Sequence, residues 1–135
     1  MAIIDNSRFN LLERSLNAAA LRQKVIANNI ANVDTPNFKR SDVVFEDLLQ
    51  KEIETSSAHF VGKRTDPRHF EIGGGSEAMP EIVTDQHSAM NNNLNNVDID
   101  REMALMAENE LRYNALIQQL NYELRQIRIA IDGRR

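Results

Sequence analysis

The sequence contains no cysteine and no tryptophan, and aromatic residues make up only 5% of its 135 positions. The absence of cysteine excludes disulfide bridges, thiolate metal sites and cysteine nucleophiles. So few aromatic side chains argue against a large, densely packed core. The length suits one ordinary domain, or two long helices with a segment between them.

A strongly basic surface is also missing, since the net charge is −4 and the Lys and Arg residues are scattered. Nucleic-acid binding needs concentrated positive charge, so nucleic acid is not an expected partner. Residues 1–10 lack the basic start and apolar stretch of a cleavable signal peptide. No run approaches the roughly 18 apolar residues that cross a bilayer. We expect a soluble protein. If it is exported, we expect a route that does not remove a leader peptide.

An apolar stripe runs through the last third of the chain, from about Asp98 to Asp132. Its members recur in steps of four and three, interrupted only by Glu110: Ile99, Met103, Met106, Tyr113, Ile117, Leu120, Leu124, Ile127 and Ile131. This spacing places them along one seam of an α-helix, roughly 50 Å long at about 1.5 Å per residue. A seam of that length needs a partner of matching length, which is typical of an assembly component.

A second periodic segment runs from about Ser7 to Ala31. Its seam contains one polar member, Gln23, among Phe9, Leu12, Leu16, Ala19, Ile26 and Ile30. A neighbouring line widens the apolar face beyond a two-stranded seam and comprises Leu11, Ala18, Leu21 and Val25. We expect the two long helices to pair and to leave this wider face for neighbouring subunits.

The middle of the chain has weaker patterns. Ser41-Asp42 is expected to cap a short helix with a face of Phe45, Leu48, Leu49 and Ile53. Residues 59–61, 69–72 and 81–83 suggest short strands, with a hairpin across Asp66-Pro67, and Gly73-Gly74-Gly75-Ser76 suggests a flexible joint.

The predicted fold is mainly α, with long N- and C-terminal helices that form a coiled-coil-like pair. Residues 1–33 are expected to form the N-terminal axial helix and residues 98–135 the C-terminal one. Residues 34–97 are expected to hold a turn, the short helix and an irregular or small β segment. The two long helices together make one core domain.

No catalytic, cofactor or metal site is predicted, and we do not expect an enzyme. His59, His69 and His87 are too far apart in weakly patterned sequence for a metal site, and no nucleophile elbow or phosphate loop occurs. Glu110 has two interpretations. It pairs with a cation across an interface and fixes the register of the packed helices, or it lies at the solvent-exposed edge of the seam.

The most specific local sequence runs from Ala27 to Lys39 and joins a helix end to a forced turn. Pro36 disfavours helical geometry at Thr35, and Phe38 offers an apolar anchor beyond the turn. The amides of Asn28, Asn29, Asn32 and Asn37 are suited to bonding exposed backbone groups. Ordinary helix ends do not need this many amides.

This run resembles the signature of the rod, hook and hook-associated axial proteins of the bacterial flagellum. The matching residues are Asn28, Asn29, Ile30, Ala31, Asn32, Asp34, Thr35 and Pro36. Many members have Gly-Tyr at Asn37-Phe38, a mild change because Asn tolerates positive φ and Phe keeps the ring. Residues 95–103 and 107–113 resemble the proximal rod branch in particular.

The resemblance implies a building block of the proximal rod that is exported unfolded by the flagellar type III apparatus without a cleaved leader. Its terminal helices would then pack as a tube around the export channel, in the basal body within the cell envelope. The implied partners are other copies, other rod proteins, a FliE-like adaptor and the export gate, with no cofactor or small-molecule substrate.

Three alternatives remain open at this point. The first alternative is another proximal rod subunit of the same family. A cytosolic coiled-coil adaptor or secretion chaperone would share the seams but would not need the asparagine-rich turn. A histidine-dependent hydrolase built from the middle segment is the most distant.

Overall fold

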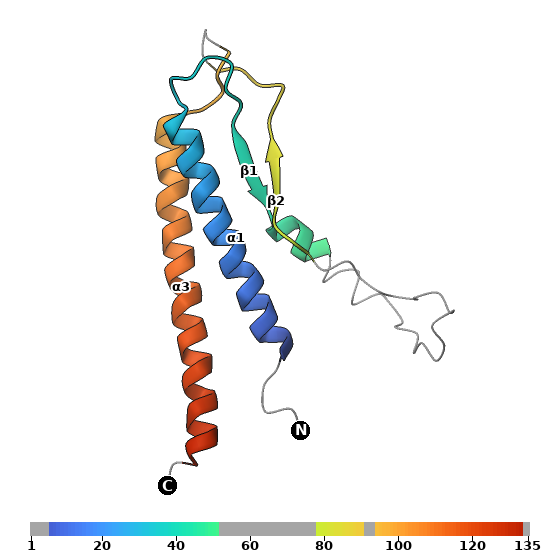
Figure 1. Ribbon diagram of the computed structural model, residues 1–135, viewed down its shortest axis with the longest axis vertical. Coiled ribbons are helices and arrows are strands. Elements are labelled where there is room, and N and C mark those ends of the chain that lie inside the picture. The colour runs from blue at the N-terminus through green and yellow to red at the C-terminus, as the bar shows by residue number, and fades with distance from the viewer. Residues whose placement is uncertain (1–5, 52–77, 91–93, 134–135) are drawn as a thin grey trace, which may run out of the picture.

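The computed structural model describes residues 6–51, 78–90 and 94–133. Two long helices, α1 (Asn6–Ala31) and α3 (Ile99–Asp132), lie side by side and run in opposite directions (Figure 1). Two short strands, β1 (Ser41–Val44) and β2 (Glu81–Thr84), lie beside them, and residues 46–51 form a short helix after β1. The prediction of a mainly α protein with two long terminal helices is confirmed.

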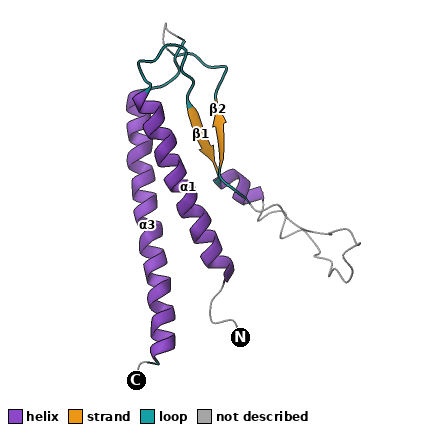
Figure 2. Cartoon of the chain, in the orientation of Figure 1, coloured by secondary structure: helices purple, strands orange, loops and turns teal. Residues whose placement is uncertain are grey.

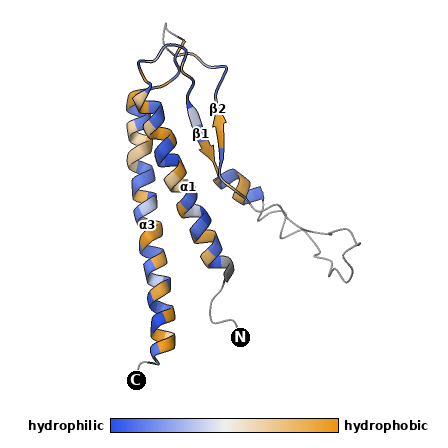
Figure 3. Ribbon diagram, in the orientation of Figure 1, coloured by the Kyte–Doolittle hydropathy of each residue, from blue (hydrophilic) through white to orange (hydrophobic). Residues whose placement is uncertain are grey.

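The two long helices differ in length. α3 has 34 residues and α1 has 26, which correspond to about 51 Å and about 39 Å at about 1.5 Å per residue. α3 therefore extends past the N-terminal end of α1 (Figure 1). Apolar and polar residues alternate along both helices (Figure 3). Within the described residues, no helix combines the length and the apolar character needed to cross a membrane.

Local sequence sets the ends of the long helices. α1 contains neither Gly nor Pro, and at its end the Asn32 side chain donates a 2.8 Å hydrogen bond to the Asn28 carbonyl oxygen. At the start of α3 the Asp98 carboxylate accepts hydrogen bonds from the backbone N–H groups of Asp100 and Arg101. Gly133 ends α3 at a φ of 53°, the left-handed conformation that favours glycine.

The sheet consists of β1 and β2 paired antiparallel, with Ser41 opposite Thr84 and Val44 opposite Glu81. β1 is the strand next to α1, and β2 lies on its outer side (Figure 2). All four side chains of β2 are exposed, whereas Val43 of β1 is buried. The sheet therefore covers one side of α1 rather than forming a core of its own.

The small apolar core lies between α1 and the segment that follows β1. Ala18 of α1, Phe45 and Ala78 are buried against one another, and Leu48 and Leu49 of the short helix pack against them. The predicted shared face of Phe45, Leu48 and Leu49 therefore faces α1. Ile53, the fourth member of that face, lies outside the described residues.

The predicted start of the short helix is wrong. Ser41 and Asp42 belong to strand β1, and the helix begins at residue 46. The reason is the pairing of Val43 with Ile82 across the sheet, which brings together β-branched residues that favour strands. The expected strand at 81–83 is confirmed as β2. The pieces at 59–61 and 69–72, the Asp66-Pro67 hairpin and the glycine joint fall outside the described residues.

The expectation that the wider face of α1 stays open for neighbours is wrong at two of its four positions. Ala18 and Val25 are buried within the chain, while Leu11 and Leu21 are half-buried. Phe45 and Ala78 cover Ala18 because the chain returns along α1 after the turn. This side of α1 is thus used inside the subunit.

Replacing Ala18 with Leu tests this packing. Ala18 is buried against Phe45 and Ala78, so three added carbon atoms must displace these neighbours, and Ala18→Leu is expected to destabilise the fold by about 1–3 kcal/mol. Ala20→Leu makes the same change at an exposed position of the same helix and is expected to stay within about 0.5 kcal/mol. Urea unfolding followed by circular dichroism measures both, and equal effects would contradict the assignment of Ala18 to the core.

Candidate assembly site

The turn after α1 is built by hydrogen bonds within the Asn32–Phe38 segment. The Thr35 N–H donates to the Asn32 carbonyl oxygen at 3.0 Å, and the Phe38 N–H donates to the Thr35 carbonyl oxygen at 3.3 Å. Asn37 has a φ of 60°. Asn is one of the few residues that adopt positive φ readily, which suits Asn37 to this position of the turn.

Asn95 holds this turn from the other side of the chain. Its buried side-chain N–H₂ group donates to the carbonyl oxygens of Asn32, Val33 and Thr35, at 2.9 to 3.0 Å. Its side-chain oxygen accepts a 2.7 Å hydrogen bond from the Val97 N–H. One buried amide therefore joins the end of α1 to the residues just before α3.

A charged cluster lies beneath the turn, between the two long helices. The Glu102 side chain is 0% exposed; one of its oxygens accepts a 3.0 Å hydrogen bond from Asn29, and the other accepts one from Arg40. Asn29 also pairs with Ser41 in both directions, donating to its carbonyl oxygen at 2.8 Å and accepting from its N–H at 3.1 Å. The start of α3, the end of α1 and β1 thus meet at one carboxylate.

Arg40 balances the charge of Glu102. Burial disfavours its charged form, but the hydrogen bonds and the attraction from Glu102 and Asp42 outweigh burial and raise the pKa of Arg40 above its ordinary value. Its backbone N–H donates to the side-chain oxygen of Asn96 at 2.6 Å. Removing one partner of a buried ion pair typically costs about 3–5 kcal/mol, so this cluster strongly specifies how the segments meet.

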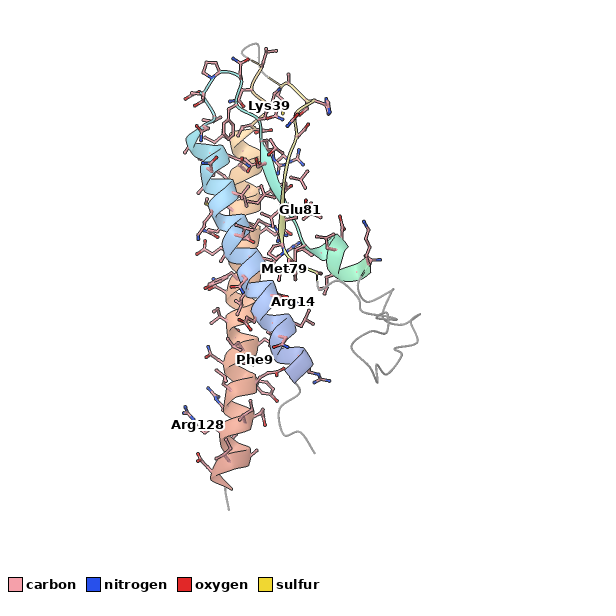
Figure 4. All side chains as sticks on the ribbon, turned by 45° about the vertical axis from the view of Figure 1, so that its right-hand side comes forward. Phe9, Arg14, Lys39, Met79, Glu81 and Arg128 are labelled. Atoms are coloured by element: carbon pink, nitrogen blue, oxygen red, sulfur yellow. The ribbon has the colours of Figure 1, made fainter. Side chains whose placement is uncertain are left out.

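Lys39, labelled at the turn end of the molecule in Figure 4, joins the loops above this cluster. Its ammonium group donates to the carbonyl oxygens of Ser88 at 2.8 Å and Leu94 at 3.0 Å. Leu94 is 56% exposed and has a φ of 63°, a strained conformation for leucine. The residues before α3 are therefore fixed to the turn by the ammonium group of Lys39 and by the side-chain amides of Asn95 and Asn96.

The family-motif residues divide into an inner and an outer set. Asn29 is buried, and Ile30, Asn32 and Phe38 are half-buried, where they build or support the turn. The exposed members form the outer set: Asn28, Ala31, Asp34, Thr35 and Pro36. The turn is thus held rigidly from inside while its outer surface stays accessible.

The predicted seam residues of the two long helices differ in how far they are buried. On α1, Ala19 and Ile26 are buried, and Leu12, Leu16 and Ile30 are half-buried. On α3, four are half-buried, namely Met106, Ile117, Leu120 and Ile127. The other four are 38% to 58% exposed: Ile99, Met103, Tyr113 and Leu124. One flank of the α3 seam is thus left open by the pairing with α1.

A second line of α3 faces α1 and is partly polar; its members each lie one residue before a seam position, namely Met103, Glu110, Ile117 and Leu124. Glu102 and Asn109 are its buried members, followed by half-buried Leu116 and Glu123. The side chain of Asn109 donates to the Ala19 carbonyl oxygen at 2.9 Å and to the Gln23 side-chain oxygen at 3.1 Å. Gln23, the polar member of the α1 seam, therefore contacts α3. Glu110, the polar member of the α3 seam, is exposed.

Sequence reasoning did not single out Arg40, Asn95, Asn96, Glu102 or Asn109 as site residues. A search for apolar periodicity passes over polar residues, even where they recur at helical spacing as Glu102, Asn109, Leu116 and Glu123 do. Of the three histidines only His87 is described, and it is exposed. Among the described residues, no cluster of three His, Cys, Asp or Glu side chains has the arrangement of a metal site.

The substitution Asn95→Asp tests whether the hydrogen bonds of the Asn95 side chain hold the turn in place. The substitution replaces a donor with a carboxylate oxygen that faces three carbonyl oxygens, and it is expected to cost about 1–3 kcal/mol of unfolding free energy. Asn114→Asp makes the same chemical change at an exposed position of α3 and serves as the control. Urea unfolding reports both values; a loss no larger than the control's would show that Asn95 does not hold the turn.

Comparisons with known proteins agree with this architecture. The model of the family described as "Flagella basal body rod protein" matches residues 9–39, which comprise most of α1 and the turn. The flagellar basal body rod protein FlgB of Bacillus subtilis (strain 168) is 37% identical over 122 residues, covering 90% of this chain and 91% of the relative. FlgB of Borreliella burgdorferi is 37% identical over 129 residues, covering 87% and 90%.

A third relative matches at lower identity. FlgB of Aquifex aeolicus (strain VF5) is 30% identical over 125 residues, and the match covers 93% of each chain. These similarities extend over both long helices and the segment between them. The chain therefore belongs to the FlgB family of flagellar basal body rod proteins.

Proposed function

We propose that the chain is a structural, non-enzymatic subunit of the proximal rod of the bacterial flagellar basal body. The observation that carries this proposal is its 37% identity, over 90% of its length, with a FlgB protein of the basal body rod. The helical hairpin supports a structural role, because its long helices present partly open faces to possible neighbours.

The proposed mechanism couples folding to assembly. The polar cluster around Glu102 fixes the turn end of the hairpin, whereas the far end has fewer internal contacts: Leu124 and Ile131 of α3 are 46% and 74% exposed. Helices gain most of their stability from packing, so the far end orders when neighbouring subunits cover it. Such coupled folding typically costs about 2–5 kcal/mol of the gross binding energy.

Assembly in this form accounts for the proposed location and partners. The chain is exported unfolded by the flagellar type III apparatus and then folds around the export channel within the cell envelope. It contacts other copies, other rod proteins, a FliE-like adaptor and the export gate. The exposed residues Asp34, Thr35 and Pro36 of the turn provide one surface for these contacts.

Charged substitutions on the α3 seam test the proposal. Leu120→Asp and Ile127→Asp each place a charge on a half-buried seam position, where desolvation disfavours packing against any apolar neighbour. We expect normal expression but loss of assembled rods and of motility. Immunoblots, swimming assays and electron microscopy of purified basal bodies measure these outcomes.

Asn121→Asp introduces the same charge at an exposed, adjacent position of α3 and is expected to leave rods and motility intact. Normal rods and normal swimming in both seam variants would rule out the seam as an assembly surface. Absence of the unmodified chain from purified basal bodies would contradict the rod assignment itself.

A further inference from the structure

The exposed leucine at the turn end, Leu94, has a backbone conformation that leucine rarely adopts. Its φ is 63° and its side chain is 56% exposed, although the next three residues, Asn95, Asn96 and Val97, are buried. A bulky side chain disfavours positive φ, whereas Asn and Gly accept it readily. Burial does not offset this strain, because more than half of the side chain stays in water. Leu94 therefore costs the isolated subunit stability, which is typical of residues with a role outside the fold.

Hydrogen bonds hold the backbone around Leu94 in place. The ammonium group of Lys39 donates to the Leu94 carbonyl oxygen at 3.0 Å and to the Ser88 carbonyl oxygen at 2.8 Å. The N–H of Met90, a second exposed apolar residue, donates to the Asn95 carbonyl oxygen at 3.0 Å. Leu94 is thus presented on a fixed backbone, and a preorganised contact loses less entropy when it binds a partner.

The loops around Leu94 carry more negative than positive charge. Residues 32–39 and 85–98 contain three acids and one cation, namely Asp34, Asp85, Asp98 and Lys39. A hydrogen bond from the Ser88 side chain lowers the pKa of Asp85, so this carboxyl is ionised at neutral pH. A partner surface that surrounds Leu94 is therefore expected to carry positive charge.

A second copy of this chain does not offer such a surface in either of two hollows formed by the described residues. One lies between α1, the short helix and α3, and the other between α1, β1 and α3. Arg22 and Arg112 line both hollows. Arg22 pairs with Glu46, and Arg112 pairs with Glu46 and Glu108. Two arginines and two glutamates leave no excess of positive charge, so neither hollow matches the surroundings of Leu94.

Resting on the proposed function, we propose that Leu94 inserts into an apolar pocket with a basic rim on a protein other than this chain. The leucine fills the pocket, and the exposed carboxylates of Asp34 and Asp85 attract the lysine or arginine side chains of the rim. An anchor residue at the centre of an interface, enclosed by contacts that exclude water, contributes much of the binding energy. The complex thereby offsets the strain that the free subunit carries at Leu94.

Two substitutions at position 94 separate binding from folding. Leu94→Asn removes the apolar side chain and suits the positive φ, so its urea unfolding midpoint is expected to equal or exceed that of the wild type. Leu94→Met keeps an apolar side chain of similar size. We expect Leu94→Asn to lower the amount of chain in purified basal bodies by about tenfold or more, the factor for losing one buried leucine, and Leu94→Met to retain it.

Urea unfolding of the purified chains and immunoblots of basal bodies, normalised to the total chain in the cells, measure these effects. A lower unfolding midpoint for Leu94→Asn would show that Leu94 stabilises the fold itself and would overturn the proposal. Equal recovery of Leu94→Asn and Leu94→Met from basal bodies would also overturn it.

A photoreactive side chain at the same position identifies the partner. p-Benzoylphenylalanine replaces Leu94, and purified basal bodies are irradiated and analysed by mass spectrometry. We expect a cross-link to a different protein, at a site that combines apolar residues with Lys or Arg. A cross-link only to this chain, a site without such residues, or no cross-link would contradict the proposal. Exclusion of this variant from basal bodies that accept Leu94→Met would support it, because only an enclosed site rejects the larger ring.

The outcomes also separate this proposal from the proposed function. If the wild type and both substituted chains are recovered equally from basal bodies, the Leu94 contact is wrong and the rod assignment stands. If the wild-type chain is absent from purified basal bodies, the rod assignment fails, and the Leu94 contact, which rests on it, fails as well.

Discussion

One buried carboxylate determines how the two long helices meet. Glu102 lies at the start of α3 and accepts hydrogen bonds from Asn29 of α1 and from Arg40, next to β1. A shift of either helix along the other would leave this charge unpaired in a buried position, which is far costlier than a shift along an apolar seam. The apolar core is small, so we infer that this polar contact, together with the Asn95 clamp on the turn, sets the register of the hairpin.

The sequence was most informative where structure depends on neighbouring residues. The α3 boundaries follow from Asp98 and Gly133, and the turn follows from Pro36 and its asparagines, all local signals. Local sequence predicts a helix cap at Ser41-Asp42, where strand β1 lies, because the pairing of β1 with β2 joins residues far apart in the chain, such as Ser41 and Thr84, and is beyond the reach of local patterns. Glu102 and Asn109 were missed because their burial is compensated by hydrogen bonds, which hydrophobic periodicity does not detect.

The rigid and the open parts of the molecule have different roles in the proposed assembly. The turn end is held by buried amides and an ion pair, so it reaches its shape within one subunit. Near the C-terminal end of α3, Leu124 and Ile131 are 46% and 74% exposed. A chain of this kind folds far enough to define its binding surfaces and leaves the completion of its helices to its neighbours. This division suits the proposed assembly, in which the ends of the helices become rigid when neighbouring subunits cover them.

Hydrogen exchange of the backbone amides, compared between dilute chain and purified basal bodies, tests this division most directly. The account predicts that amides near Asn29 and Glu102 are protected in both samples. Amides at the far ends of the hairpin, residues 8–16 and 120–132, should exchange quickly in the dilute chain and slowly in the basal body. Equal, strong protection of both ends in the dilute chain would contradict the account, because the hairpin would then be complete without its neighbours.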